Sequence, residues 1–508
     1  MKKNILLLVI CWMGILSVSR AQNITYSEPD KDDVRNMDYE IMGKMNGNIL
    51  IYKNYRGSYY ISIYDGDMKM TDKIKLDFLP DRIFNTDFLQ YPDHFDVFYQ
   101  YQKKNIVYAM AVSIDGNGKK IGDPVQLDTT EISYSASTKI YTVLNSDDKQ
   151  KILLFKINSR NEKIHYVTSC LFDKDLKLLQ RARIGVNMPD RNDFLTEFQL
   201  DNDGDLVYVR ASGTTQNDNI NKLTLITKPA AGDSVTYTDL RLNNVNLDDI
   251  RVKVDNFNKH YLVTSFYSKQ KRGNIDGLYC YLWSKIEKKE LLNTTVVFPD
   301  ELRADARSDG GIKSAFNDFF LRNIVMKQDG GFVVASESVY TSSRGNNYNR
   351  WDYMNGTPGY GYGGFNSYYY SSPYGYYPWN RYNNYGVSVT RYYADNIAIL
   401  SLDVTGKMEW NNVISKSQYD DNSDNFISYG VMNSGDQVHF LFNVQEKRQL
   451  VLTDQSITPD GQVLRAPTLK NLDRGYDFMP RHTKQTGSRQ VIVPCEYRSY
   501  VCFAKIDF

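Results

Sequence analysis

Residues 397–414 read IAILSLDVTGKMEWNNVI, and this stretch has the pattern of a single β-hairpin. An apolar run ends at Asp403, a turn follows at Thr405 and Gly406, and a more polar run begins near Trp410. Asp and Gly suit a tight turn, because Asp hydrogen-bonds to the nearby backbone and Gly accepts a positive φ. The stretch therefore predicts two antiparallel strands joined by a short turn.

Hairpins of this kind recur along nearly the whole chain. Other examples read YISIYDGDMKMTDKIKL, YAMAVSIDGNGKKIGDPVQL, YVTSCLFDKDLKLLQRARI and LVLTDQSITPDGQVLRAPTL. An earlier hairpin precedes each one, and its turn-plus-strand pieces begin at Gly47, Asp93, Lys149, Gly204, Lys259, Gly330, Gly435 and Ser488. Most of these starts are about 45 to 56 residues apart, which is the size of a four-stranded propeller blade.

The repeat predicts an all-β fold, a β-propeller of eight four-stranded blades. The last unit ends in YVCFAKIDF and lacks a fourth strand, whereas Asn23 to Glu28 form a short strand without a partner of their own. That strand can complete the last blade and close the ring, which removes exposed sheet edges. Seven blades is the alternative. We expect residues 22–508 to form one domain, with a Tyr/Gly-rich insertion at about 340–392.

The first residues, MKKNILLLVICWMGILSVSRAQ, have the pattern of a cleavable secretory signal. A basic start precedes an apolar run from Ile5 to Leu16, and small residues precede a cleavage point before Gln22. We expect residues 1–21 to be the signal peptide. The apolar run is too short to span a bilayer, and no later stretch is long and apolar enough for a transmembrane helix. The prediction is export to the periplasm, the outer membrane or the outside of the cell.

Bulk composition argues against several classes of protein. The formal net charge of +1 does not suit a nucleic-acid binder, and no nucleic acid is expected as a partner. The chain has 40 tyrosines, which favours β structure. Cys495 and Cys502 flank a predicted two-residue turn at Arg498 and Ser499. They are either a cross-hairpin disulfide or two buried apolar side chains.

The hairpin of residues 397–414 resembles the tryptophan-docking repeat of eight-bladed quinoprotein dehydrogenases. In that family the motif recurs in most blades, whereas here only Trp410 occupies the position. The resemblance implies propeller architecture, with Trp410 packing between neighbouring blades. It does not imply a quinone, and no cofactor is predicted.

Motifs for metal or nucleophilic catalysis are weak. The stretch DNDGD, residues 201–205, resembles the start of a calcium loop, but its glycine is misplaced and a hairpin turn is the favoured interpretation. The five histidines lie in different units and form no HExxH pair. No metal site and no catalytic residue is predicted.

Asp and Arg cluster just before the first strand of several units. In a propeller these connections lie at the mouth of the central channel, so their side chains could ring one opening and bind a polyhydroxylated or charged ligand. The alternative is that they cap turns and tie blades together. The candidate ligand-binding residues are Arg82, Asp190, Arg191, Asp249, Arg251, Asp473 and Arg474.

The insertion in the sixth unit is rich in Tyr and Gly and almost free of aliphatic residues. It cannot bury a core of its own, and we expect it to emerge between the second and third strands on the face of the Asp/Arg ring. Its aromatic rings could stack on sugars or on a protein, or the segment could be a loop without a specific ligand. Its candidate contact residues are Trp351, Tyr369 and Trp379.

The favoured function is a non-enzymatic exported propeller that binds a protein or glycan partner at the cell envelope. Two alternatives stay open. One is a carbohydrate-active enzyme, a glycoside hydrolase or a lyase, that uses carboxylates at the channel mouth. The other is an accessory subunit of an outer-membrane complex, associated peripherally with that membrane.

Overall fold

A computed structural model describes most of the chain, in thirteen segments. They are residues 22–30, 37–136, 138–161, 163–190, 193–214, 219–232, 234–271, 273–308, 311–343, 390–421, 424–446, 449–466 and 475–508. The predicted signal peptide, and residues 344–389 of the predicted insertion, lie outside the described residues.

The strands form eight consecutive units, here called blades 1 to 8. Blades 1 to 4 are β2 (Met37–Met45), β3 (Asn48–Tyr55), β4 (Ser58–Tyr64) and β5 (Met70–Lys75); β6 (Asn85–Gln90), β7 (His94–Lys103), β8 (Ile106–Asp115) and β9 (Lys120–Glu131); β10 (Thr142–Asn145), β11 (Lys151–Asn161), β12 (Ile164–Asp173) and β13 (Leu178–Asn187); and β14 (Asp193–Leu200), β15 (Leu206–Thr214), β16 (Asn219–Lys228) and β17 (Thr236–Asp239). Blades 5 to 7 are β18 (Asn246–Asp255), β19 (His260–Ser268), β20 (Gly277–Ser284) and β21 (Lys289–Val297); β22 (Phe319–Met326), β23 (Phe332–Ser343), β24 (Thr390–Leu402) and β25 (Met408–Asp421); and β26 (Tyr429–Asn433), β27 (Val438–Glu446), β28 (Gln449–Ile457) and β29 (Val463–Arg465). Blade 8 contains β30 (Tyr476–Phe478), β31 (Lys484–Gly487), β32 (Gln490–Tyr497), β33 (Tyr500–Asp507) and β1 (Asn23–Tyr26).

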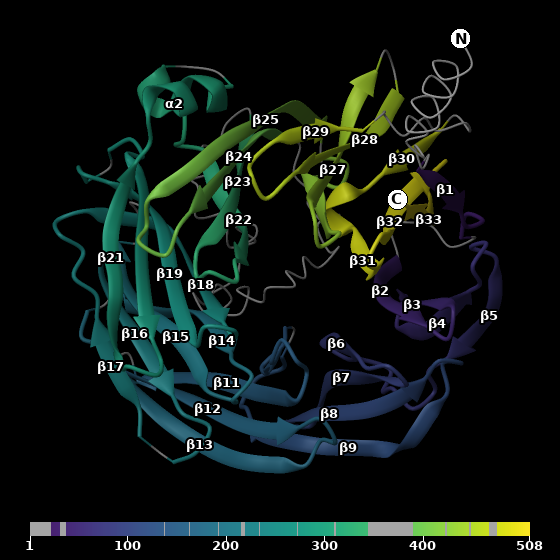
Figure 1. The fold of residues 1–508 in the computed structure, drawn as a ribbon. Coiled ribbons are helices and arrows are strands. Elements are labelled where there is room, and N and C mark those ends of the chain that lie inside the picture. The colour runs from purple at the N-terminus through teal and green to yellow at the C-terminus, as the bar shows by residue number, and fades with distance from the viewer. Residues whose placement is uncertain are drawn as a thin grey trace, which may run out of the picture.

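The blades are arranged as a ring, and the chain runs once around it (Figure 1). All strand pairings are antiparallel, and blades 4 and 5 are joined into one eight-stranded sheet by the single pair Ile220 and Leu247. In blade 8 the first strand is split into β30 and β31, which both pair with β32. The predicted eight-bladed propeller is therefore confirmed.

The N-terminal strand closes the ring as predicted. β1 pairs with β33, and Asn23 lies opposite Asp507. The backbone N–H of Ser27 then donates to the carbonyl of Phe503, and the amide of Phe503 donates back to the Ser27 hydroxyl. The buried Lys53 ammonium of blade 1 reaches across this seam to Asp30 at 2.5 Å and to the Tyr64 hydroxyl at 2.7 Å. The first and last parts of the chain thus stabilise each other.

The hydrophobic core is divided among the spaces between blades. Eight buried apolar clusters each combine side chains from two adjacent blades among the described residues. One of them joins Tyr39 of blade 1 to Phe503 of blade 8, so the core is continuous around the ring. Middle strands are buried on both faces, which explains their continuous apolar runs; β19 has eight buried residues in nine.

The turn chemistry seen in the sequence has a structural basis. The carboxylate of Asp403 accepts hydrogen bonds from the backbone N–H groups of Thr405 and Lys407 at 2.8 and 3.0 Å. The turns that begin at Asp65, Asp115 and Asp173 repeat this arrangement. An Asp at the first turn position therefore specifies the third-to-fourth-strand turn in these blades.

Trp410 packs between blades, as the resemblance implied. Its indole N–H donates to the carbonyl of Pro459 at 3.0 Å, and its ring covers Gly461 of the blade 7 turn. A Cβ at Gly461 would lie 2.6 Å from this ring, so only glycine fits. Ile74 and Leu292 cover the corresponding Gly118 and Gly406, which shows that aliphatic residues occupy the docking position in other blades.

One face of the ring carries the connections into each first strand and the turns between second and third strands; we call it the mouth face. The ends of the insertion lie on this face, because Ser343 at the end of β23 pairs with Thr390 at the start of β24. Helix α2 (Asp300–Ala306) and the short 3-10 helices η2 (Ile312–Ser314) and η5 (Pro480–His482) lie in connections on the same face. Among the described residues, no helix has the length and apolar character needed to cross a bilayer.

Candidate functional site on the mouth face

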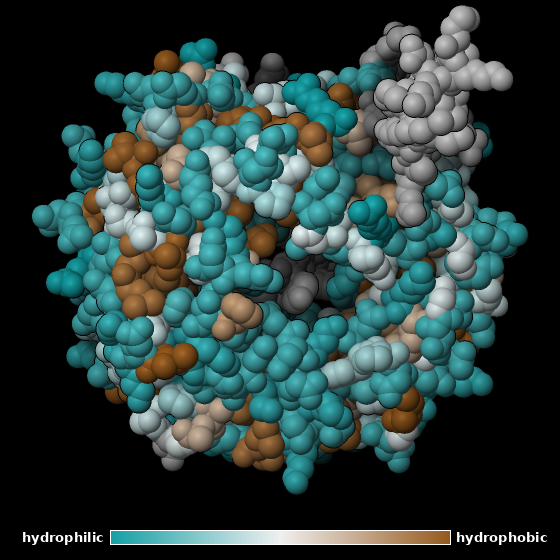
Figure 2. Space-filling view, in the orientation of Figure 1, coloured by the Kyte–Doolittle hydropathy of each residue, from teal (hydrophilic) through white to brown (hydrophobic). Residues whose placement is uncertain are grey.

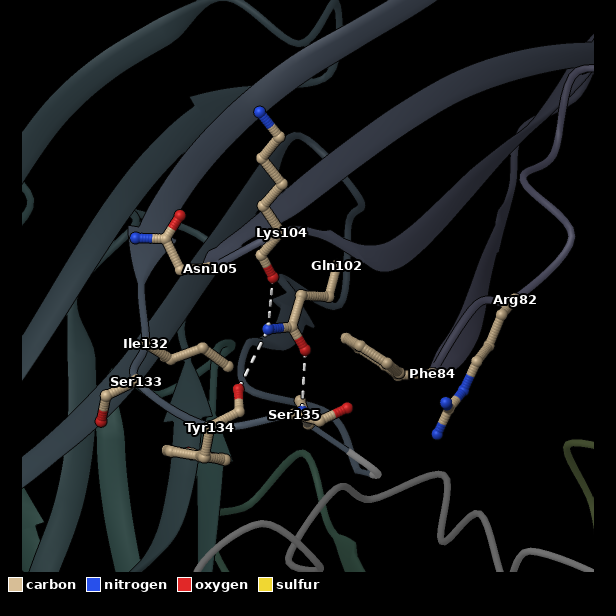
Figure 3. Close-up of a pocket in the computed structure, with 10 residues that line it drawn as sticks. Arg82, Phe84, Gln102, Lys104, Asn105, Ile132, Ser133, Tyr134 and Ser135 are labelled. Carbon is tan, nitrogen blue, oxygen red and sulfur yellow. Dashed lines mark hydrogen bonds between the residues drawn. The ribbon is translucent and has the colours of Figure 1, made fainter.

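A pocket of about 390 Å³ lies over blade 2 on the mouth face. Three segments build it: the connection into β6, the turn between β7 and β8, and the connection from β9 to β10. Its lining residues are Arg82, Phe84, Gln102, Lys104, Asn105, Ile132, Ser133, Tyr134, Ser135 and Ala136 (Figure 3). Arg82 belongs to the predicted Asp/Arg ring, whereas the other lining residues were not predicted.

The floor of the pocket is apolar. Phe84 and Ile132 pack against the buried cluster between blades 2 and 3, which includes Phe98 and Leu154. Tyr134 lies at the rim with 60% of its surface exposed, so its ring is accessible to a ligand. The pocket therefore combines a rigid apolar base with a polar rim, which is typical of small-ligand sites.

Two glutamines of β7 hold the rim in place. Gln102 donates to the carbonyls of Lys104 and Tyr134 at 2.8 and 3.0 Å, and its carbonyl oxygen accepts from the amide of Ala136 at 2.8 Å (Figure 3). Gln100, two residues earlier on the same strand face, binds the backbone of Ile140 and Tyr141 in the same way. The connection that carries Tyr134 is thus anchored at both ends and preorganised.

A buried ion cluster lies at the start of this connection. The Asp128 carboxylate contacts the Lys156 ammonium at 3.1 Å, the Arg181 guanidinium at 2.9 Å and the Tyr141 hydroxyl at 2.9 Å. Burial raises the pKa of Asp128, but Lys156, Tyr141 and Arg181 outweigh it, so the net pKa is below the usual value. The cluster joins blade 2 to blade 3 beneath the rim and keeps Asp128 ionised.

Asp249 and Arg251 connect three blades. The structure places them within β18, at a bulge, rather than in the connection before it as the sequence suggested. Asp249 accepts from the amide of Leu321 in blade 6 at 2.5 Å and contacts Arg251 at 3.2 Å. Arg251 also contacts Glu197 of blade 4 at 3.1 Å. These contacts match the alternative that such residues tie blades together; their role in ligand binding stays a prediction.

The remaining candidates of the ring are not brought together. Asp190 accepts from the Lys222 ammonium at 2.7 Å and from the Ser212 hydroxyl at 3.2 Å within blade 4. Burial slightly opposes this, but the hydrogen bond from Lys222 holds the pKa of Asp190 below its usual value. Arg191, Asp473, Arg474, Trp351, Tyr369 and Trp379 lie outside the described residues.

A second buried ion cluster, in blade 6, was missed by the sequence. Glu337 has no exposed surface and contacts the Lys416 ammonium at 2.8 Å and the Arg322 guanidinium at 3.4 Å. The Ser428 hydroxyl donates to the same carboxylate at 2.5 Å. Burial raises the pKa of Glu337, but the two cations outweigh it and lower the pKa overall. Glu337 therefore orders blade 6 and its junction with blade 7 below the ends of the insertion.

The DNDGD stretch forms a hairpin turn, as favoured from the sequence. A lysine ammonium occupies the position that a metal ion would take, because Lys285 of blade 5 contacts Asp201, Asp203 and Asp205 at 2.6, 2.7 and 2.8 Å. Burial lowers the pKa of Lys285, but its hydrogen bonds to the three carboxylates raise it well above the usual value. The turn thus links blades 4 and 5 through an ion cluster.

Comparisons with known proteins assign no family. No family model matches the chain, and no curated protein matches it. Among solved structures, an ulvan lyase of a new polysaccharide lyase family, bound to -[GlcA(1-4)Rha3S]-, has a TM-score of 0.36 at 10% identity over 82% of this chain and 90% of that chain. Prolyl oligopeptidase B from Galerina marginata has a TM-score of 0.40 at 8% identity over 92% of this chain, which spans 56% of that chain. A thermostable family-43 glycoside hydrolase has a TM-score of 0.23 at 10% identity, over 55% of this chain and 96% of that one. Likenesses at this level leave the function to the chain's own residues.

Proposed function

We propose that this chain is an exported, non-enzymatic β-propeller that binds a glycan in the pocket over blade 2. The observation that carries the proposal is the apolar floor of Phe84 and Ile132 beneath a preorganised polar rim with an exposed Tyr134 ring. A sugar has an apolar C–H face that stacks on an aromatic ring and hydroxyl groups that need hydrogen-bond partners at the rim.

The composition of the pocket favours binding over catalysis. A glycoside hydrolase uses two carboxyl groups at a defined separation, and none of the ten described lining residues carries one. On the described first strands, Asp249 and Glu197 are both engaged with Arg251. The face seen in Figure 2 is predominantly hydrophilic around the central hollow, which suits a sugar or a polar surface better than an apolar ligand.

A glycan array tests the proposal directly. The mature protein is compared with Tyr134→Ala and with Tyr237→Ala, a control that removes another exposed tyrosine, from β17 of blade 4. We expect the mature protein to retain a defined set of glycans. Tyr134→Ala should weaken their binding about tenfold, the loss expected for one stacking ring. Tyr237→Ala should bind as the unmodified protein does.

Three outcomes would contradict the proposal. Equal loss in both variants, or no loss in either, would move the site away from the pocket. Release of shortened or unsaturated saccharides would identify a carbohydrate-active enzyme. Retention of no glycan, together with specific recovery of an envelope protein from membrane extracts, would identify a protein partner, such as an outer-membrane complex.

A further inference from the structure

The pocket over blade 2 has unbalanced positive charge. Arg82 and Lys104 are among its lining residues, and neither side chain pairs with a carboxylate among the described residues. The nearby Glu131 carboxylate accepts from the Asn105 amide at 2.5 Å and is not a lining residue. A ligand in this pocket therefore meets cations without competing internal anions.

Arg82 differs in this respect from other arginines of the ring. Arg391 forms a two-point contact with Asp421, Arg251 contacts Glu197 and Asp249, and Arg303 donates to three backbone carbonyls. Their guanidinium groups are occupied by structural contacts. Arg82 is exposed, and its side chain projects from the connection into β6 (Figure 3). Its planar fork of N–H donors is available to an external acid group.

We propose that the ligand of this pocket is an acidic saccharide, and that Arg82 binds its carboxylate or sulfate group. The proposal rests on the glycan-binding function proposed above and names its substrate class. The sugar ring lies over the Phe84 floor and beside Tyr134, and the acid group faces Arg82. The volume of about 390 Å³ accommodates a short segment of a chain rather than an extended polymer. The rest of the polymer extends over the open mouth face.

Lys104 provides a matched control. It carries the same charge on the same pocket, but its ammonium points away from Gln102 and from the rim (Figure 3). A general electrostatic attraction would weaken equally with either substitution, whereas a direct contact would weaken only with Arg82. Arg82→Lys keeps the charge and removes the fork, so it separates the two effects further.

The test is calorimetric titration with oligoglucuronate and with the same oligosaccharide after reduction of its carboxyl groups to neutral glucose units. We expect the reduced form to bind about tenfold more weakly, which is the worth of one charge-assisted hydrogen-bonded contact. Arg82→Gln should lose the preference for the acidic form. Lys104→Gln should keep it, and Arg82→Lys should fall between the two.

The outcomes separate this inference from the proposed function. Equal binding of both oligosaccharides, unaffected by Arg82→Gln, would overturn the acidic ligand and leave glycan binding intact. Binding of inorganic sulfate as tightly as oligoglucuronate, competing for the same site, would make this a general anion site and would overturn both. Failure of both oligosaccharides to bind, with other glycans retained on the array, would overturn only the ligand class.

A separate observation concerns the two cysteines of blade 8. Cys495 and Cys502 lie directly opposite each other in β32 and β33, both are fully buried, and their Sγ atoms are 2.8 Å apart. The Cα atoms of opposed antiparallel residues lie about 4.5 to 5.5 Å apart, which is within the range that a disulfide spans. The predicted turn between them is present, with positive φ at Arg498 and Ser499.

We infer that Cys495 and Cys502 form a disulfide across the closing blade. Two S–H bonds are lost, one S–S bond forms, and two electrons and two protons pass to a disulfide oxidant, which becomes a dithiol. The bridge would lock β33, the strand to which β1 pairs, onto the rest of blade 8. It therefore strengthens the point at which the ring is closed.

The test is refolding with a mixture of oxidised and reduced glutathione, followed by unfolding and alkylation. Cys170 and Cys280 lie in different blades and act as internal controls that are fully alkylated. We expect the peptide with Cys495 and Cys502 to escape alkylation and to be lighter by two hydrogens, and the protein to unfold at higher temperature than after reduction. Full alkylation of all four cysteines would overturn the inference. In Cys495→Ala/Cys502→Ala, an unfolding temperature equal in oxidised and reduced buffer confirms that the shift comes from this bridge; a shift that persists would overturn it.

Discussion

The side-chain amide of Gln102 donates to the main-chain carbonyl of Tyr134 at 3.0 Å, and the same side chain accepts from the amide two residues further on. One residue of a rigid strand thereby fixes the short segment that carries the exposed tyrosine of the pocket. The rim is held by the propeller rather than by its own contacts. Such preorganisation lowers the entropy lost when a ligand binds.

Replacing Gln102 tests whether this anchor orders the rim. Gln102→Leu leaves the backbone groups of Tyr134 and Ala136 without their partner, and we expect a loss of stability of about 1 kcal/mol because the site is half-exposed. Hydrogen–deuterium exchange should rise in residues 133–136 and stay unchanged in other blades. Gln449→Leu, at the exposed start of β28, is the control. Unchanged exchange at the rim would show that the anchor is dispensable.

The seam between the two ends of the chain predicts a thermodynamic cycle. Lys53→Met leaves the buried Asp30 carboxylate unpaired, and we expect the free energy of unfolding to fall by about 3 kcal/mol. Lys53→Met/Asp30→Leu should recover most of this loss, because no charge is then left without a partner. Urea unfolding measures both. A single variant as stable as the unmodified protein would show that the ion pair does not stabilise the closed ring.

The docking of Trp410 on Gly461 predicts a steric effect that can be separated from a backbone effect. Gly461→Ala places a Cβ against the indole ring at a φ of +86°, and we expect a cost of about 3 kcal/mol. Gly435→Ala is the control, since its φ is +93° but nothing lies within 4 Å of its Cβ, and about 1 kcal/mol is expected. Thermal unfolding that gives equal losses would remove the packing role of Trp410.

The Asp128 cluster predicts a dependence of stability on pH. The pKa of Asp128 is lower in the folded protein than in the unfolded chain, so its ionised form stabilises the fold above the unfolded pKa. This contribution is lost as the pH falls through the folded pKa. Asp128→Asn should therefore cost about 3 kcal/mol at neutral pH and progressively less as the solution becomes acidic. A difference that does not change with pH would contradict this assignment.

Much of the fold could be predicted because its determinants are local. The Asp at positions such as Asp403 and Asp115 binds the backbone two and four residues ahead, so the turn chemistry is contained in five residues. The ring closure was also predictable, because a blade short of one strand and a strand short of one blade stand at opposite ends of the chain.

The pocket was largely missed because its parts come from separate segments. Arg82, Gln102 and Tyr134 meet only after blades 2 and 3 have packed together. A signal was present in β7, where Gln100 and Gln102 alternate within a buried, aromatic strand and need polar partners. The role of Arg251 was equally hidden, since its partners Glu197 and Leu321 lie 54 and 70 residues away.

Ligand-dependent hydrogen–deuterium exchange of the mature protein with oligoglucuronate tests the central claim most directly. The account predicts slower exchange in the connection into β6 and in residues 131–136, and this protection should disappear in Arg82→Gln. Protection centred instead on the first strands of blades 4 to 6, with no change around Tyr134, would place the glycan at the central channel and contradict the account.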